Sequence, residues 1–359
     1  MNGKRFIFLT LLVSLAATLV FGATQTRAVS LHNNWEERGF HILNQGGNHN
    51  QFTFAVTADM REYSGPGQYD TQQYFRGACE TIAALGGGAF LVSPGDVDPP
   101  ADVKWTIEQY ISQNYLWYPV VGNHDAETPA DMEWLRAYDY DANGSNPPNI
   151  VNTGPPRCQE TTYSFDYGNA HFVVLNEYCD DVSDTHMDGD VVDVLYNWLV
   201  ADLSATDKPH IFVFGHEPAY PQPDADNGRL RHLGDSLDGH PANRDRFWDL
   251  LEYKGVVAYI CGHTHNYSIV EIDGVWQLDA GHARGKGDIG ARSTFILIHV
   301  NGDIVTFETY RDDAKDGSYT LAHRGTLAGV LIYLPVVIRA CPFFEKQISI
   351  PDPADRRIT

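Results

Sequence analysis

The stretch Ile260-Cys261-Gly262-His263-Thr264-His265-Asn266-Tyr267 follows an apolar run over residues 256–260. A short run of β-branched and aromatic residues is typical of a buried strand, which here would end at Gly262. In extended backbone, residues i and i+2 lie on the same face, so we expect His263 and His265 to point the same way. Two neutral imidazoles at a strand end commonly bind a transition metal. Because an isolated His-x-His motif is equally consistent with two unrelated loop histidines, the rest of the chain has to decide between them.

The composition is that of a folded, acidic protein. Of the 359 residues, 43% are hydrophobic and 12% are aromatic, which is enough for one large core. Acidic residues outnumber basic residues by 47 to 25, and the formal net charge is -22. This charge argues against broad binding of nucleic acids or anionic membranes, which requires clustered Lys and Arg. An anionic substrate would need a local positive charge, which bound metal ions supply.

The N-terminus has the pattern of an export signal. Lys4 and Arg5 precede the apolar residues 6–21, and the small-residue site Thr26-Arg27-Ala28 follows. We expect residues 1–28 to be removed as a signal peptide and the protein to be secreted or periplasmic, with an uncleaved anchor as the alternative. The apolar run is short for a bilayer span, so we expect no membrane span in the mature chain. Residues 29–50 form a polar entry segment.

Two cysteines flank a predicted β-hairpin. Residues 162–175 have the pattern of a strand, a turn at Tyr167-Gly168-Asn169 and a second strand. Cys158 and Cys179 lie beyond the open end of this hairpin, where a bridge could close it. We predict a disulfide between them, as an exported protein permits. Cys261 lies at a strand end and is interpreted as a small buried apolar residue and not as a ligand.

The first part of the chain alternates strands and helices. Strands are predicted at residues 52–57, 89–92 and 117–121, and helices at 69–85 and 101–113. Each strand is followed by a polar residue. This order predicts a βαβαβ unit with a ligand site along the carboxyl edge of its sheet.

The second part predicts a further sheet. Helices are expected at residues 128–138, 191–203 and 244–253, a strand at 210–214, and closing antiparallel strands at 275–279, 294–300 and 304–310. The fold class is therefore α/β with two sheets, in one domain over residues 51–312, followed by a C-terminal tail over 313–359. Within the tail, residues 327–338 are apolar but too short to span a bilayer, and are either an added edge strand or a surface-docking segment.

Polar residues of metal-ligand type follow the predicted strands of both halves. They are Asp59, Asp96, Asn123, His216, His263 and His265. Singly, each aspartate would be interpreted as a turn residue or a helix cap. Together they form a mixed oxygen and nitrogen set suited to Mn, Fe or Zn, and Asp96 could bridge two ions. Cysteine is absent from the set, which disfavours a structural zinc site.

The motifs that carry these residues resemble those of the calcineurin-like metallophosphoesterase family. The matching elements are Asp59, Gly95-Asp96, Gly122-Asn123-His124-Asp125, Gly215-His216 and Gly262-His263-Thr264-His265. The resemblance implies a four-layer αββα sandwich of two mixed β-sheets, and a two-metal site that hydrolyses phosphomonoesters or phosphodiesters through a metal-activated water. The implied substrate is a small phosphoester.

The resemblance also implies a role for each residue. One metal would take Asp59, Asp96 and His265, and the other would take Asp96, Asn123, His216 and His263. His124, paired with Asp125, would orient the phosphate and protonate the leaving oxygen. A supporting role behind the ligands is the alternative for His124.

The first motif departs from the family pattern at Arg61, where members commonly carry a histidine. Arginine stays protonated and cannot bind a cation, so the first metal site loses one ligand. Three interpretations remain open. Arg61 clamps the phosphate beside two metals, its charge replaces one of the metals, or the protein is a catalytically weakened module that binds phosphate or a nucleotide. His282 and Arg284 could contact phosphate or compensate for the lost ligand, or be an exposed loop pair.

Overall fold

A six-stranded sheet is built around the predicted βαβαβ unit. The computed structural model describes residues 50–60, 71–138, 147–284, 290–312 and 316–329. Strands β1, β2 and β3 run parallel, as expected, with helices α1 and α2 between them. The sheet order is β13-β12-β11-β1-β2-β3. The elements are β1 (Gln51–Val56), α1 (Thr71–Ala84), β2 (Leu91–Ser93), α2 (Pro100–Tyr110), β3 (Trp117–Pro119), β11 (Thr294–Asn301), β12 (Ile304–Asp312) and β13 (Tyr319–Ala328).

A seven-stranded sheet holds the middle of the chain in the order β4-β5-β6-β7-β8-β10-β9. Its strands β6, β7 and β8 are parallel, and β5 and β6 form the predicted hairpin. The disulfide between Cys158 and Cys179 is confirmed. The elements are β4 (Ile150–Thr153), β5 (Tyr163–Tyr167), β6 (Ala170–Val174), α5 (Asp193–Ala205), β7 (His210–Phe214), α6 (Pro241–Lys254), β8 (Ala258–Cys261), β9 (Tyr267–Ile272) and β10 (Val275–Ala280).

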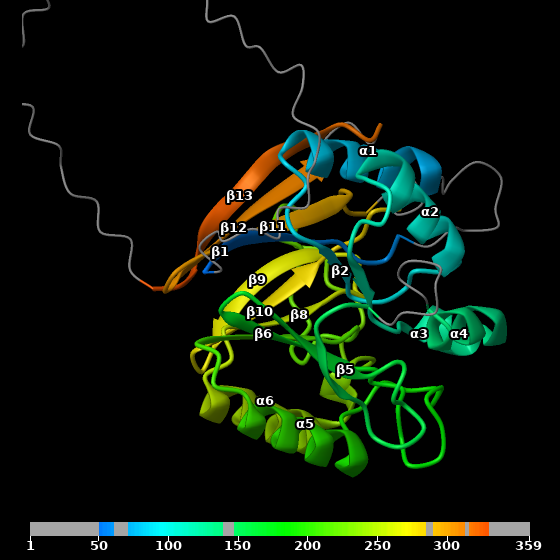
Figure 1. Cartoon of the computed structure of the whole chain (residues 1–359), viewed down its shortest axis with the longest axis vertical. Coiled ribbons are helices and arrows are strands. Elements are labelled where there is room, and N and C mark those ends of the chain that lie inside the picture. Colours follow the sequence, from blue (N-terminus) through cyan, green and yellow to red (C-terminus); the bar gives the residue numbers. More distant parts are fainter. Residues whose placement is uncertain (1–49, 61–70, 139–146, 285–289, 313–315, 330–359) are drawn as a thin grey trace, which may run out of the picture. The chain divides into compact units, whose positions relative to one another are not determined.

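The two sheets pack face to face through an aromatic core. The ring of Phe54 on β1 stacks on Phe90 at 5.3 Å and meets the edges of Phe172 and Phe212 of the second sheet, each at 5.2 Å. Ala55, on the opposite face of β1, packs toward α1 and α2, because side chains alternate along a strand. Helices α5 and α6 cover the outer face of the second sheet. The layers are therefore αββα, as the resemblance implied (Figure 1).

Several elements differ from the sequence-based expectation. The strand at residues 275–279 is β10, which lies in the second sheet, parallel to β8 and antiparallel to β9. The short helix α3 (Asn123–Glu127) precedes α4 (Pro129–Arg136), and a turn of 3-10 helix covers Leu237–Gly239. Strand β13 pairs with β12, so the first sheet continues beyond residue 312, where we expected the domain to end.

Some expectations concern residues outside the described part of the chain. These are the signal peptide over residues 1–28, the entry segment up to residue 49, Arg61 and the tail from residue 330 onward. Among the described helices, none combines the length and the apolar character needed to cross a membrane.

Candidate metal centre

The candidate residues follow strands of both sheets and converge on one edge. Asp59, Asp96 and Asn123 follow β1, β2 and β3, while His216 and His263 follow β7 and β8. The strand ends approach each other so closely that two glycines are required. A Cβ atom on Gly95 would lie 2.3 Å from Nδ1 of His216, and one on Gly122 would lie 2.3 Å from Oδ1 of Asp96. Gly95 therefore allows the contact between the two sheets, and Gly122 allows the close approach of the loops that follow β2 and β3 in the first sheet.

Four of the candidate residues have left-handed backbone. Their φ angles are 50° at Asp59, 54° at Asp96, 67° at His263 and 59° at His265. This conformation is uncommon for residues other than glycine and turns the chain sharply after each strand. Our expectation that His263 and His265 share a face because the backbone there is extended was therefore based on the wrong conformation. Both lie in the loop between β8 and β9, where the hydroxyl of Thr264 donates a hydrogen bond to Asp279.

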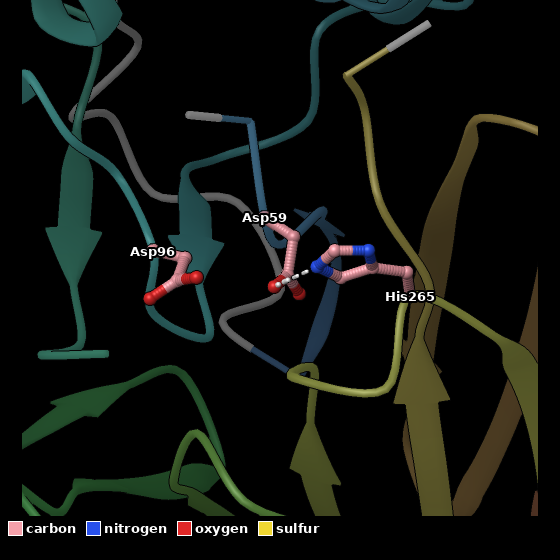
Figure 2. A group of neighbouring side chains, drawn as sticks. All are labelled: Asp59, Asp96 and His265. Carbon is pink, nitrogen blue, oxygen red and sulfur yellow. Dashed lines mark ion pairs between the residues drawn. The ribbon is translucent and has the colours of Figure 1, made fainter. Parts of the chain in front are cut away.

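Asp59, Asp96 and His265 form one group of ligand-type side chains (Figure 2). Their ligand atoms all lie within 4.8 Å of one another, and the three residues are buried. Oδ2 of Asp59 accepts the backbone N–H of His263 at 2.9 Å. Oδ1 of Asp59 lies 3.3 Å from Nε2 of His265, yet it has no hydrogen-bond partner among the described residues. A buried carboxylate oxygen in this state favours a positive charge nearby.

Asp96, Asn123 and His216 form a second, overlapping group, and the ring of His263 lies beside that of His216, with 5.0 Å between the centroids. Nδ1 of His216 donates to the carbonyl oxygen of Pro94 at 2.8 Å, which leaves the lone pair on Nε2. Nε2 in turn lies 3.1 Å from Oδ1 of Asn123 and 3.5 Å from Oδ1 of Asp96. Nε2 of His263 donates to the carbonyl oxygen of Asp235 at 3.1 Å, so the lone pair of that ring is on Nδ1. Histidines that bind metals are typically fixed in this way.

The pKa values of the buried groups at the site favour a bound cation. Burial alone would lower the pKa of His216. The negative charges of Asp96 and Asp59 outweigh this effect and raise the pKa to about 9. Burial, together with His216 and His232, holds the pKa of His263 well below its usual value. Burial raises the pKa of Asp59, but its interaction with the nearby His265 lowers it by more. One buried histidine therefore holds a proton where oxygen atoms converge, and a metal ion would replace that charge.

His124 and Asp125 do not form the expected pair. Both oxygens of the Asp125 carboxylate accept backbone N–H groups, from Gly122 at 2.8 Å and from Val97 at 3.1 Å. Nδ1 of His124 instead lies 3.5 Å from a carboxylate oxygen of Glu127, and its Nε2 lies 3.8 Å from Oδ2 of Asp96. Asp125 thus fixes the loops that carry Asp96 and Asn123, while the His124 ring is 33% exposed at the mouth of the site.

Two arginines at the site were not predicted as contacts of His265. Nη1 of Arg231 lies 2.7 Å from Nδ1 of His265, and Nη1 of Arg284 lies 2.8 Å from Nε2. Arg284 and His282 are buried, which excludes the exposed loop pair. Arg231 lies in a long loop whose sequence carries no motif, so only its positive charge in an acidic chain could have indicated it. Arg61 lies outside the described residues.

Comparison with known proteins identifies the fold family. The family model described as calcineurin-like phosphoesterase matches residues 52–267. The chain belongs to the calcineurin-like phosphoesterase family. The matched segment includes each of the six candidate metal ligands. Membership supports metal-dependent phosphoesterase chemistry in general terms, and the converging side chains of the site agree with it.

The chain is also similar to solved structures, at low sequence identity. A Plasmodium protein, described as "GAP50 the anchor in the inner membrane complex of Plasmodium", is 17% identical with a TM-score of 0.52. The match covers 77% of this chain and 89% of that one. The structure titled "Structure of PhoD" is 15% identical with a TM-score of 0.47, and covers 80% of this chain and 73% of that one. No curated protein matches the chain.

The residues present fit a metal ion. Mixed carboxylate, amide and imidazole ligands suit Mn, Fe and Zn, and no described cysteine belongs to either group. The approach of Oδ1 of Asn123 to the lone pair of His216 supports this fit. Two acceptors at that distance repel each other unless a proton or a metal ion lies between them.

Proposed function

We propose that the protein is an exported metal-dependent hydrolase of small phosphomonoesters or phosphodiesters. The observation that carries the proposal is the second group of ligands. Asp96, Asn123 and His216 converge from strand ends of both sheets, and the ring of His263 lies 5.0 Å from that of His216, with both rings fixed by backbone carbonyls. When bound, a transition metal ion neutralises phosphoryl oxygens and lowers the pKa of a water molecule toward neutrality.

The residues of the chain would divide the remaining work. His124 is partly exposed and its Nε2 lies 3.8 Å from Asp96, so its ring can reach a phosphate bound at the site. As a general acid it would donate a proton to the leaving oxygen. Its backbone N–H donates to Oδ1 of Asp96 at 3.1 Å, which orients that carboxylate. Asp125 is a positioning residue, because its carboxylate binds backbone and not the His124 ring.

Export is supported by the N-terminal sequence and by the disulfide. Disulfides persist in oxidising compartments, and the Cys158–Cys179 bridge suits a secreted or periplasmic protein. The net charge of -22 disfavours long nucleic acids as substrates. We therefore favour a small phosphoester whose negative charge is met at the centre itself.

The test is hydrolysis of p-nitrophenyl phosphate and bis(p-nitrophenyl) phosphate by protein freed of metal with a chelator. We expect no turnover until Mn or Zn is added, and a loss of more than about a hundredfold in kcat/KM in His216→Ala. The matched control is His299→Ala, because His299 is a partly exposed histidine on β11 that pairs with Thr53 and lies outside both ligand groups. It should behave as the wild type.

The alternative is a catalytically weakened module that binds phosphate or a nucleotide. The arginines at His265 are the observation that favours it, since guanidinium groups bind phosphate without hydrolysing it. Calorimetric titration with phosphate and with a nucleotide would separate the two functions. Tight binding without metal-dependent turnover on either aryl ester would favour the binding module.

A further inference from the structure

The three site histidines differ in what contacts their ring nitrogens. His216 and His263 each donate one ring N–H to a backbone carbonyl, which leaves a lone pair for a metal. His265 has guanidinium groups at both nitrogens, from Arg231 at Nδ1 and from Arg284 at Nε2. A guanidinium group has only donors and stays protonated. The His265 ring is therefore set up to accept a hydrogen bond.

This arrangement places positive charge beside the lone pair of His265 in either tautomer, because Nη1 of Arg284 lies 2.8 Å from Nε2 and 3.3 Å from Nδ1. A neutral imidazole has one acceptor nitrogen and one N–H. If Nδ1 accepts from Arg231, the proton is on Nε2, which then faces Oδ1 of Asp59 at 3.3 Å. If Nε2 accepts from Arg284, the proton is on Nδ1. In both cases a guanidinium charge lies close to the nitrogen whose lone pair would bind a metal, Arg231 at 2.7 Å from Nδ1 or Arg284 at 2.8 Å from Nε2, and its repulsion disfavours a cation there.

Both arginines are held in place by contacts of their own segments. The backbone N–H of Ala283 donates to the carbonyl oxygen of Ala58, so the segment that carries Arg284 lies directly beside Asp59. Arg284 is only 5% exposed. Arg229 lies two residues before Arg231 in the same loop. Its Nε donates a hydrogen bond to Oδ1 of Asn266 at 2.8 Å. The guanidinium group of Arg284 therefore belongs to the buried structure of the site, whereas Arg231 is half-buried.

We propose that the centre binds a single metal ion, held by Asp96, Asn123, His216 and His263, and that Arg284, supported by Arg231, replaces the second cation. The inference rests on the proposed phosphoester chemistry. One interpretation of the sequence was that the charge of Arg61 replaces a metal ion. Among the described residues, Arg284 is in the position to take this role. Its positive charge would face the substrate phosphate from the side of Asp59 and His265.

The test is metal content, measured independently of activity. The full chain, freed of metal and then dialysed against Mn or Zn, should hold one ion per chain by elemental analysis. With Mn, its electron paramagnetic resonance spectrum should be that of an isolated ion and not of a spin-coupled pair. Two ions per wild-type chain, or a coupled spectrum, would overturn the proposal.

Variants assign the roles of the residues. His265→Ala should keep the single ion with an affinity within about threefold of wild type, whereas His216→Ala should lose at least about a hundredfold in affinity. The double variant Arg231→Gln/Arg284→Gln should accept a second ion. Its control, Arg76→Gln, removes a half-exposed arginine of α1 that pairs with Glu80 and should leave the count unchanged. Loss of the ion from His265→Ala, or an unchanged count in the double variant, would contradict the assignment.

Two measurements keep these results interpretable. Thermal unfolding of each variant shows whether it is folded, and the wild-type count decides the stoichiometry even if a variant does not fold. A wild-type chain with one ion and no turnover would refute the hydrolytic function but support the stoichiometry of one metal ion per chain. A chain that hydrolyses esters with two ions would refute the stoichiometry alone.

Discussion

The carboxylate of Asp59 accepts the backbone N–H of His263 at 2.9 Å, across 204 residues of sequence. This hydrogen bond joins the end of β1 in the first sheet to the loop after β8 in the second. It orients the His263 loop through backbone, so Asp59 contributes to the centre even if it binds no ion. The same aspartate also faces His265 with its other oxygen.

Replacing Asp59 with alanine should therefore destabilise the protein even without metal. The variant leaves a buried N–H without an acceptor, which costs about 1–3 kcal/mol. Asp59→Asn keeps an acceptor oxygen and tolerates left-handed backbone, so it should lose less. Urea unfolding of the two metal-free variants measures the difference, and equal stabilities would contradict the role of this hydrogen bond.

His124→Ala should slow the reaction without removing the metal. The loss of a general acid lowers kcat by about 10²–10⁴-fold, and the loss should be larger for an alkyl phosphate than for a p-nitrophenyl ester, whose leaving group needs no proton. Steady-state kinetics on both esters, with metal analysis alongside, tests this. Equal losses on the two esters would indicate that His124 orients the phosphate and does not donate a proton.

Asp125→Ala should impair metal binding through the backbone. The carboxylate holds the N–H groups of Gly122 and Val97, and these two loops carry Asn123 and Asp96. We expect a loss of about 1–3 kcal/mol in stability and a 10- to 100-fold weaker metal affinity, about that of a lost supporting contact. Metal titration and urea unfolding measure the two effects. A metal affinity equal to that of the wild type would contradict the positioning role of Asp125.

His171 should make the stability of the second sheet depend on pH. Burial lowers the pKa of His171, but its hydrogen bonds to Asp202 at 2.9 Å and Asp166 at 2.8 Å raise it above 6.5 overall. Because the pKa of His171 is higher in the folded state, its ionised ring stabilises the protein in full at pH values below the pKa of the unfolded chain. This stabilisation is lost as the pH rises through the pKa of the folded state.

The variant His171→Gln measures this contribution. It should lose about 1–3 kcal/mol near pH 6, and less near pH 9, since the contribution of a histidine with a raised pKa falls as the pH rises. Urea unfolding of both proteins at the two pH values gives the difference. Lys208, 3.5 Å from Asp166, is present in both proteins and is therefore common to both measurements. A loss that is the same at both pH values would contradict it.

Local patterns in the sequence were sufficient to predict much of the fold. The parallel unit of β1, β2 and β3 follows from apolar runs that alternate with helical segments, and the bridge from Cys158 to Cys179 follows from the hairpin between them. The strand-end residues were predicted for the same reason, because parallel strands direct their carboxyl ends to one edge. Strand β13 was missed because its polar sequence, with Gly325 in its interior, has little strand propensity.

Contacts between distant loops could not be predicted in this way. The loop that carries Arg231 is tethered by Asp224, which accepts from the buried Arg311 at 2.9 Å across 87 residues. No periodicity encodes such a pair. Likewise, ordinary propensities favour extended backbone after β8, and the sharp turns at His263 and His265 depend on the hydrogen bond to Asp59. The arginine contacts of the centre were missed for these reasons.

The left-handed backbone at Asp59, Asp96, His263 and His265 lowers the stability of the fold but places these side chains at the metal centre. Each such residue costs about 1–2 kcal/mol relative to glycine, which adopts this conformation freely. In a random library selected only for resistance to heat, these four positions should drift toward glycine or asparagine. A library selected for turnover should keep them unchanged, so evolution toward durability and toward activity would diverge first at this centre.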